Sequence, residues 1–224
     1  KSLIFEGFLS CMLGQLRSFF KPFFALLARP FIALRVHPSL LSLLGVPFAL
    51  ATAGALATEQ WALALLLLPL SGVWDAIDGT VARALNLQSL WGNYFETMID
   101  KLVEIIVFVG LAFVAPVAAI AALGLGLLSS YAKPRVALVI ITDNRDWPAI
   151  GEHADKMVLL WLGVLVSVFV PFVNGWRVIE ITLGLIALIS LIGTIQRMQY
   201  AKRLIADAEK EGTILPYLKS GKER

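Results

Sequence analysis

Long apolar stretches, separated by short polar or proline-containing breaks, follow one another along most of this chain. A helix needs about 20 mostly apolar residues to cross a membrane. We predict six spanning helices, over residues 40–57, 61–74, 95–114, 117–141, 157–170 and 179–195. The second and third reach full length only if they continue through neighbouring acidic residues. The pattern therefore indicates an all-α membrane protein built as one bundle.

The first 36 residues follow a different pattern. Apolar side chains recur there at helical spacing, but basic residues and prolines interrupt them repeatedly. We interpret residues 1–36 as an amphipathic helical segment lying in the membrane interface, with an extra span as the alternative. Residues 37–200 then form the transmembrane domain, and residues 201–224 form a polar cytoplasmic tail.

Composition agrees with this assignment. Hydrophobic residues make up 58% of the 224 residues and charged residues only 16%, whereas soluble domains contain roughly 45–50% apolar residues. The mean hydropathy is +0.81. A single cysteine, Cys11, excludes an internal disulfide. The net charge of +3 is small, so no nucleic-acid partner is expected.

Basic residues predict the orientation. They gather before the first predicted span, after the second and fourth, and after the sixth, while the opposite connections carry little charge beyond Glu59 and Arg177. Cytoplasmic loops of membrane proteins are enriched in Lys and Arg, so we expect both termini in the cytoplasm. The Ala- and Leu-rich spans favour a prokaryotic plasma membrane.

Four acidic residues, Asp75, Asp78, Glu96 and Asp100, interrupt the second and third apolar segments. Each ionised carboxylate near a bilayer centre costs about 2.5–3.5 kcal/mol on insertion scales. The spacings i, i+3 and i, i+4 place each pair on one helix face. We expect the two helices to be antiparallel neighbours, so that the four carboxylates meet in one cleft open to the cytoplasm.

Carboxylate oxygens favour Mg²⁺, Mn²⁺ or Ca²⁺, and the absence of a nearby His or Cys in the sequence argues against zinc. Four carboxylates suit two metal ions, an arrangement that stabilises the attacking and leaving oxygens of phosphoryl transfer. Gly79 and Gly92 would allow a ligand or the partner helix to approach closely, and Arg83 could bind a phosphate bidentately. For each glycine alone, ordinary helix packing is the alternative.

These residues carry a resemblance to a known family. The pattern resembles the signature of the CDP-alcohol phosphotransferase family, in the order Asp75-x-x-Asp78-Gly79-x-x-Ala82-Arg83-x8-Gly92-x3-Glu96-x3-Asp100. The segment Pro38-Ser39-Leu40-Leu41-Ser42 is similar to the Pro-Asn-x-x-Thr start of that family's first span. Glu96 departs from the pattern, because the family usually has Asp there.

The resemblance implies an enzyme of phospholipid biosynthesis. It would transfer a substituted phosphoryl group from a CDP-alcohol, such as CDP-diacylglycerol or a CDP-linked ether lipid, to an acceptor hydroxyl and release CMP. Asp75, Asp78, Glu96 and Asp100 would hold two divalent cations, Mg²⁺ or Mn²⁺. Asp100 would also be the catalytic base. The CDP-binding residues would be Asp78, Gly79, Ala82, Arg83 and Gly92, and the family is commonly homodimeric.

A second basic set suggests where the acceptor binds. We expect an anion pocket formed by Lys133, Arg135, Lys156 and Arg197. This is similar to the family branch whose acceptor is inositol phosphate, although its usual Glu-Arg-x-x-Arg pattern reads Glu152-His153-Ala-Asp-Lys156 here. The alternative is that these residues only orient the protein in the membrane. Glycerol phosphate, serine and inositol are the other candidate acceptors.

Three further residues lie close to these motifs. Glu104 follows Asp100 by one turn and would extend the polar cleft, and Lys101 would balance charge or extend toward the interface. We expect the isolated His153 to be a hydrogen-bonded residue at a helix start and not a metal ligand. A cation transporter would also explain buried acids, but not the glycines and Arg83 at these intervals. A catalytically silent scaffold is a third alternative, in which Glu96 would be the residue that abolishes activity.

Overall fold

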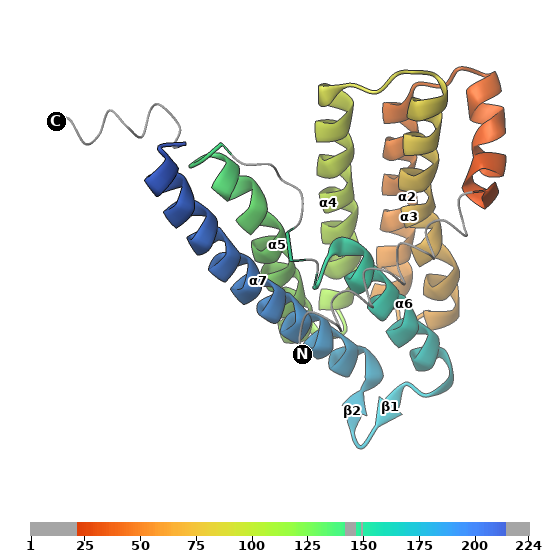
Figure 1. Cartoon of the computed structure of the whole chain (residues 1–224). Helices are drawn as coiled ribbons and strands as arrows, with labels where there is room; N and C mark the ends of the chain where they lie inside the picture. Colours follow the sequence, from red (N-terminus) through yellow and green to blue (C-terminus); the bar gives the residue numbers. More distant parts are fainter. Residues whose placement is uncertain (1–21, 142–146, 149, 214–224) are drawn as a thin grey trace.

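The computed structural model describes residues 22–141, 147–148 and 150–213. Within them a helix over Pro22–Ala33 precedes six longer helices and a short hairpin (Figure 1). These elements are α2 (Pro38–Ala57), α3 (Trp61–Ala84), α4 (Leu90–Ala112), α5 (Pro116–Ala137), α6 (His153–Phe169), β1 (Phe172–Val173), β2 (Trp176–Arg177) and α7 (Val178–Glu211). The fold class is all-α, as predicted.

The six long helices occupy the six predicted segments. Among the described residues, α2, α3, α5 and α7 are long and apolar enough to cross a membrane. Helix α4 carries several charged side chains in its first 15 residues, and α6 has only 17 residues. Four candidate spans therefore support an integral membrane protein, and the count of six stays a prediction.

The interfacial segment predicted over residues 1–36 is described only in part, because residues 1–21 lie outside the described ranges. The helix Pro22–Ala33 packs its buried Ala28 against Leu41 of α2 and against Ile77 and Val81 of α3. It thus contacts α3, which carries Asp75 and Asp78, and α2, which carries none of the four motif acids. Its depth in a membrane stays a prediction.

Helix α2 is the common partner of α3 and α4, whereas α3 and α4 touch each other at few points. The two acid-bearing helices run in opposite directions, as expected, but they do not pack along their length. Close contact between α2 and α4 depends on Gly110, where a Cβ atom would lie 2.5 Å from backbone atoms of Ala53. No side chain fits at this position. Helix α2 therefore packs against both acid-bearing helices, whereas the short loop had led us to expect direct packing of α3 against α4.

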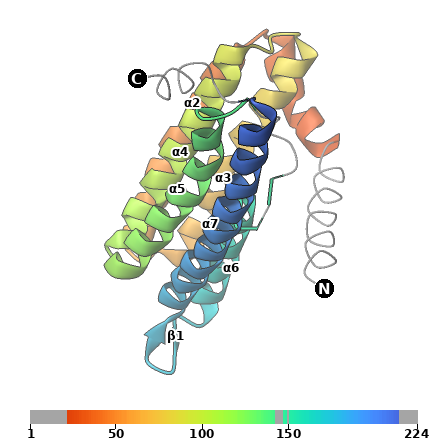
Figure 2. The same cartoon turned by 60° about the vertical axis from the view of Figure 1, so that its left-hand side comes forward.

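The remaining helices complete the bundle. Helix α5 packs against α4 and α7, and α6 packs against α3 and α7 (Figure 2). All six long helices contribute buried residues to the main core, in which Phe108, Leu160 and Leu183 are almost fully buried. Burial of such apolar surface contributes roughly 25 cal/mol per Å² in water, and inside a lipid bilayer close packing takes over that role.

The two ends of the bundle differ. The start of α2, the α3–α4 loop and the end of α7 lie at one end, and the α2–α3 turn and the β1–β2 hairpin lie at the other (Figure 1). The described chain therefore enters α2 and leaves α7 at the same end of the bundle, and the two termini lie outside the described residues. The side of the membrane on which this end lies stays a prediction.

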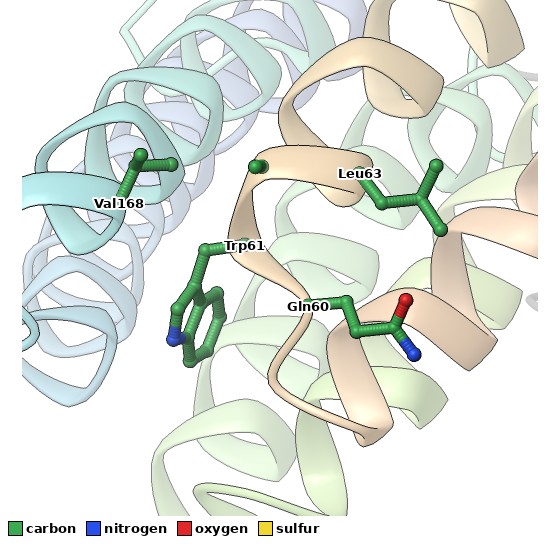
Figure 3. A pocket seen from close by; sticks show the side chains of 5 residues that line it. Gln60, Trp61, Leu63 and Val168 are labelled. Carbon is green, nitrogen blue, oxygen red and sulfur yellow. The ribbon is translucent and has the colours of Figure 1, made fainter.

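An ion pair and a shallow pocket mark the hairpin end. Arg177 of β2 contacts Glu59 of the α2–α3 turn, with 2.6 Å between Nη1 and Oε2. The pocket beside this turn, about 410 Å³, is lined by Gln60, Trp61 and Val168 among others (Figure 3). Its lining residues carry no charged side chain, so it lacks the chemistry that the acidic motif predicts.

Helix α7 is longer than its predicted span. It continues through 34 residues to Glu211 and ends at Gly212, whose φ of 73° is left-handed. Ala208 in its last turns packs with Val136, Ile140 and Trp147 near the end of α5. The boundary that we expected between the transmembrane domain and the tail, at residues 200 and 201, therefore falls inside α7. The helix packs there because Ala208 makes apolar contacts beyond the end of the predicted span.

Candidate active site

Three of the four motif carboxylates converge at the junction of α3 and α4. Oxygen atoms of Asp75, Asp78 and Glu96 lie within 4.8 Å of one another. The short connection is closed by Ser89, whose hydroxyl accepts a hydrogen bond from the Gly92 amide at 2.9 Å and so caps α4. An N-cap of this kind fixes where the helix starts, and with it the face on which Glu96 lies.

Asp78 is the most enclosed member of this trio, with 2% of its surface exposed. Ser42 of α2 donates a hydrogen bond to its Oδ2. The other oxygen, Oδ1, is buried and has no hydrogen-bond partner within the described residues. A buried carboxylate oxygen without a partner is costly, and a bound cation would remove that cost. The residues therefore fit a divalent metal ion.

Asp100 stands one turn beyond Glu96 on α4 and is half-buried. It lies outside the trio of closely spaced oxygens, but it lies within electrostatic range of Asp75, Glu96 and His153. Asp100 is thus close both to the acidic trio and to the first residue of α6. We refer to Asp75, Asp78, Glu96 and Asp100 together as the acidic cluster.

A cleft of about 620 Å³ opens beside the acidic cluster. Its walls include all the residues that we expected to bind CDP, namely Asp78, Gly79, Ala82, Arg83 and Gly92. The start of α2 supplies another wall through His37, Pro38, Ser39 and Ser42. The sequence signal for that wall was the Pro38–Ser42 segment, to which we had assigned no role in the site.

Arg83 lies against Gly79 on the same face of α3, as the i, i+4 spacing predicted. A Cβ atom at position 79 would stand 3.4 Å from Nη1 of Arg83. The guanidinium also donates from Nη2 to the Thr80 hydroxyl at 3.3 Å, while the side chain stays exposed. The result is a cationic fork at the mouth of an otherwise acidic cleft, which suits a phosphate-bearing ligand.

Two of the basic residues expected to bind the acceptor are buried and bonded to protein groups. Lys156 is 1% exposed and pairs through Nζ with Oε1 of Glu104. Arg197 donates to Ser129 at 2.8 and 2.9 Å and to the Pro148 carbonyl at 3.2 Å. Lys133 is half-buried and Arg135 exposed near the end of α5. The structure brings Lys156 and Arg197 within electrostatic range of each other.

Glu104 has a larger structural role than we expected. Its carboxylate is fully buried and contacts Lys101 at 2.7 Å, His153 at 3.1 Å, and Lys156. We call these four residues the Glu104 network. His153 is the hydrogen-bonded residue at a helix start that we predicted. The only sequence signal for the network was an acidic residue inside an apolar run, since its partners on α6 lie about fifty positions away.

A family model described as CDP-alcohol phosphatidyltransferase matches residues 35–196. The chain belongs to this family. The match covers most of the chain and contains the acidic cluster and the cleft. The protein is therefore a CDP-alcohol phosphotransferase of phospholipid biosynthesis, which disfavours the transporter and silent-scaffold alternatives.

Two curated relatives carry related names. The chain is 24% identical over 198 residues to the archaetidylinositol phosphate synthase of Pyrococcus horikoshii, which covers 86% of this chain and 97% of the relative. It is 25% identical over 142 residues to the phosphatidylinositol phosphate synthase of Cutibacterium acnes, covering 58% and 67%. Both relatives are thus synthases of inositol-phosphate lipids.

Solved structures share the fold. The phosphatidylinositol phosphate synthase of Mycobacterium tuberculosis with CDP-DAG bound superposes with a TM-score of 0.67 at 22% identity, covering 80% of this chain and 92% of that one. The same enzyme in complex with manganese and citrate gives 0.68 at 20% identity, covering 80% and 88%. At this identity the likeness establishes the arrangement of the helices.

Proposed function

We propose that this protein transfers the phosphatidyl-type group of a CDP-linked lipid to a hydroxyl of inositol phosphate and releases CMP. The donor would be CDP-diacylglycerol or a CDP-linked ether lipid. The observation that carries the proposal is the convergence of Asp75, Asp78 and Glu96 in the wall of the cleft that also contains Gly79 and Arg83. The names of the curated relatives support inositol phosphate as the acceptor.

The acidic cluster would hold the divalent cations, and we propose two of them, Mg²⁺ or Mn²⁺. Asp78 presents a buried oxygen without a protein partner, while Ser42 holds its other oxygen. Glu96, where the family usually has Asp, still brings a carboxylate oxygen within 4.8 Å of oxygens of Asp75 and Asp78. When bound, the cations would neutralise charge on the pyrophosphate and on the leaving group.

The nucleotide half of the cleft is formed by small residues and one cation. Gly79, Ala82 and Gly92 leave room for the donor to lie against α3 and α4. Arg83 would bind a phosphate oxygen pair through its planar guanidinium, which Thr80 holds across the face of Gly79. A bidentate contact of this kind orients the pyrophosphate as well as binding it.

Asp100 would act as the general base. It would accept the proton of the acceptor hydroxyl as that oxygen bonds to the β-phosphorus of the donor. The bond between this phosphorus and the bridging oxygen breaks, and CMP leaves with the bridging oxygen. The closeness of Asp100 both to the acidic trio and to the first residue of α6 supports this role, because the acceptor must enter from the side opposite the nucleotide.

The basic residues Lys133, Arg135, Lys156 and Arg197 would form the acceptor end of the site. Lys156 and Arg197 act there mainly by shaping the local field, since both already bond protein groups. Lys133 and Arg135 retain more exposure. Loss of Lys133 or Arg197 to Ala should raise the KM for the acceptor far more than the KM for the donor.

We also infer that the cleft faces the cytoplasm of a prokaryotic plasma membrane and that the protein works as a homodimer. The positive-inside distribution of Lys and Arg supports the orientation. The family resemblance supports the dimer. Cross-linking in native membranes would test the dimer, and accessibility of a cysteine placed at Lys202 to an impermeant reagent would test the orientation.

The test uses purified protein with CDP-diacylglycerol, labelled inositol phosphate and Mn²⁺ or Mg²⁺. We expect release of CMP and a labelled lipid, both abolished by a chelator. Glycerol phosphate, serine and inositol serve as competing acceptors in parallel reactions. Absence of metal-dependent CMP release with every acceptor would refute the proposed function, and preference for another acceptor would refute only the assignment of inositol phosphate.

A further inference from the structure

Glu104 is a fully buried carboxylate that the proposed reaction does not use. It gathers cationic or hydrogen-bonding partners from two helices, namely Lys101 of its own helix α4 and His153 and Lys156 of α6. A buried ion pair contributes little to stability compared with packed apolar residues. The position of this carboxylate therefore calls for an explanation other than stability.

Its position relative to the site gives that explanation. Glu104 follows Asp100 by four residues, so the two side chains lie on the same face of α4 one turn apart. His153 bonds Glu104 through Nδ1 at 3.1 Å and also lies within electrostatic range of Asp100. The first turn of α6 is thereby held directly beside the proposed base.

Helix α5 is shaped to admit this ion pair. At Gly126 a Cβ atom would lie 2.8 Å from Nζ of Lys156 and 3.5 Å from Oε1 of Glu104. Glycine in a helix interior costs about 1 kcal/mol relative to alanine in model systems, yet here it leaves the space that Lys156 occupies. Three helices thus meet at the carboxylate of Glu104.

The donor cleft is separate from this network. It is lined by the start of α2, the end of α3, the α3–α4 loop and the start of α4, and its lining includes none of the four residues of the Glu104 network. A substitution in the network should therefore affect the part of the site between Asp100 and α6 and leave the donor cleft unchanged. The acceptor KM reports on the first part and the donor KM on the second.

We propose that Glu104 is a positioning residue for the acceptor half of the site. It holds the first turn of α6 against α4 and so sets where His153 and the nearby basic side chains stand relative to Asp100. The inference rests on the proposed function and adds to it a residue that acts through its neighbours. The side chain of Glu104 itself touches neither substrate.

The test compares Glu104→Gln, Glu104→Asp and Gly126→Ala with the unaltered protein, using CDP-diacylglycerol and inositol phosphate. Glu104→Gln should raise the acceptor KM by about 10- to 100-fold, the range typical for partners that orient site residues, with the donor KM unchanged. Glu104→Asp keeps the charge and should recover part of this loss. Gly126→Ala should shift the acceptor KM in the same direction without removing any charge, because it displaces Lys156.

Ser167→Ala is the matched control, since Ser167 is a buried polar residue of α6 that, among the described residues, donates a hydrogen bond only to the Gly163 carbonyl of its own helix. Its acceptor KM should stay at the starting value. If Glu104→Gln does not fold, Gly126→Ala carries the test alone. An unaltered acceptor KM in an active, folded variant, or equal rises in both KM values, would overturn the inference. Absence of turnover in the unaltered protein would instead refute the proposed function, and the positioning role with it.

Discussion

Two polar clusters lie one helical turn apart on α4 and are built in opposite ways. The acidic cluster brings like charges together, with three carboxylates within 4.8 Å and a buried Asp78 oxygen that lacks a partner among the described residues. The Glu104 network surrounds one carboxylate with Lys101, His153 and Lys156. The first cluster thus presents an unsatisfied acceptor to the cleft, whereas the carboxylate of Glu104 is surrounded by donors.

The difference between the two clusters corresponds to their proposed roles, which are ligand binding for the acidic cluster and positioning for the Glu104 network. Like charges at short range repel, and the buried Asp78 oxygen without a partner among the described residues adds a desolvation cost, so a bound cation would stabilise the acidic cluster. In the Glu104 network the attraction between opposite charges offsets their desolvation. A membrane protein can therefore hold carboxylates for two purposes, and the charges around each carboxylate distinguish them.

The largest expected effect comes from removing the proposed base in the acidic cluster. Asp100→Asn should lower kcat by about 10²–10⁴-fold, the contribution typical of a positioned general base. Donor binding should remain, because Asp100 does not line the donor cleft. CMP release and calorimetric donor binding, measured on the same preparation, check both statements. A loss of donor binding as large as the loss of CMP release would show that Asp100 acts through metal or donor binding alone, and would refute its role as the base.

The next largest effect is expected on the free energy of unfolding when the Glu104 network is broken. Lys156→Met leaves Glu104 short of its most buried partner and should lower the free energy of unfolding by about 3–5 kcal/mol. The double variant Glu104→Leu with Lys156→Met should recover most of this loss, because no buried charge is left unpaired. Denaturant unfolding in detergent measures both. Lys210→Met, in an exposed pair with Asp207, is the control and should change little.

The third prediction concerns the acidic cluster, where a bound metal ion should raise the stability of the protein. Mn²⁺ at a hundred times its dissociation constant should stabilise the protein by about 2.7 kcal/mol, as for any ligand of the folded state. Asp78→Asn should lose most of this gain, and a chelator should reverse it in the unaltered protein. Thermal unfolding with and without Mn²⁺ gives the measurement. Equal stabilisation of both proteins would exclude Asp78 as a ligand.

The smallest effect is expected at the hairpin end. The pair between Glu59 and Arg177 is partly exposed, with side chains 44% and 31% accessible. Glu59→Gln should therefore lower stability by only about 0.2–1 kcal/mol, as exposed ion pairs usually do. Both KM values and kcat should match those of the unaltered protein. A change in kinetics would mean that this end is coupled to the distant site.

The sequence was sufficient wherever the physics is local. Apolar stretches predicted the six long helices, because each helix satisfies its own backbone hydrogen bonds in an apolar setting. The spacing of Asp75, Asp78, Glu96 and Asp100 predicted two acidic helix faces. The glycines and Arg83 predicted a phosphate-binding wall, and the structure lines one cleft with these residues.

Local reasoning failed where contacts join distant segments. It paired α3 with α4 because a short loop connects them, whereas α2 packs against both and supplies Ser42 to Asp78. It placed the last apolar span over residues 179–195 and a polar tail from residue 201, whereas α7 continues to Glu211 along apolar contacts with the end of α5. The spacing of residues along the chain does not show which distant segments pack together.

The sequence alone thus determined the long apolar helices, the acidic motif and the residues that line one wall of the cleft, since these depend on periodicity within a helix. Only the tertiary structure decided which carboxylates gather with other acids and which are surrounded by donors. Glu96 and Glu104 stand in the same helix and look alike in the sequence. They differ because α3 brings further acids to one, while α6 brings Lys156 and His153 to the other.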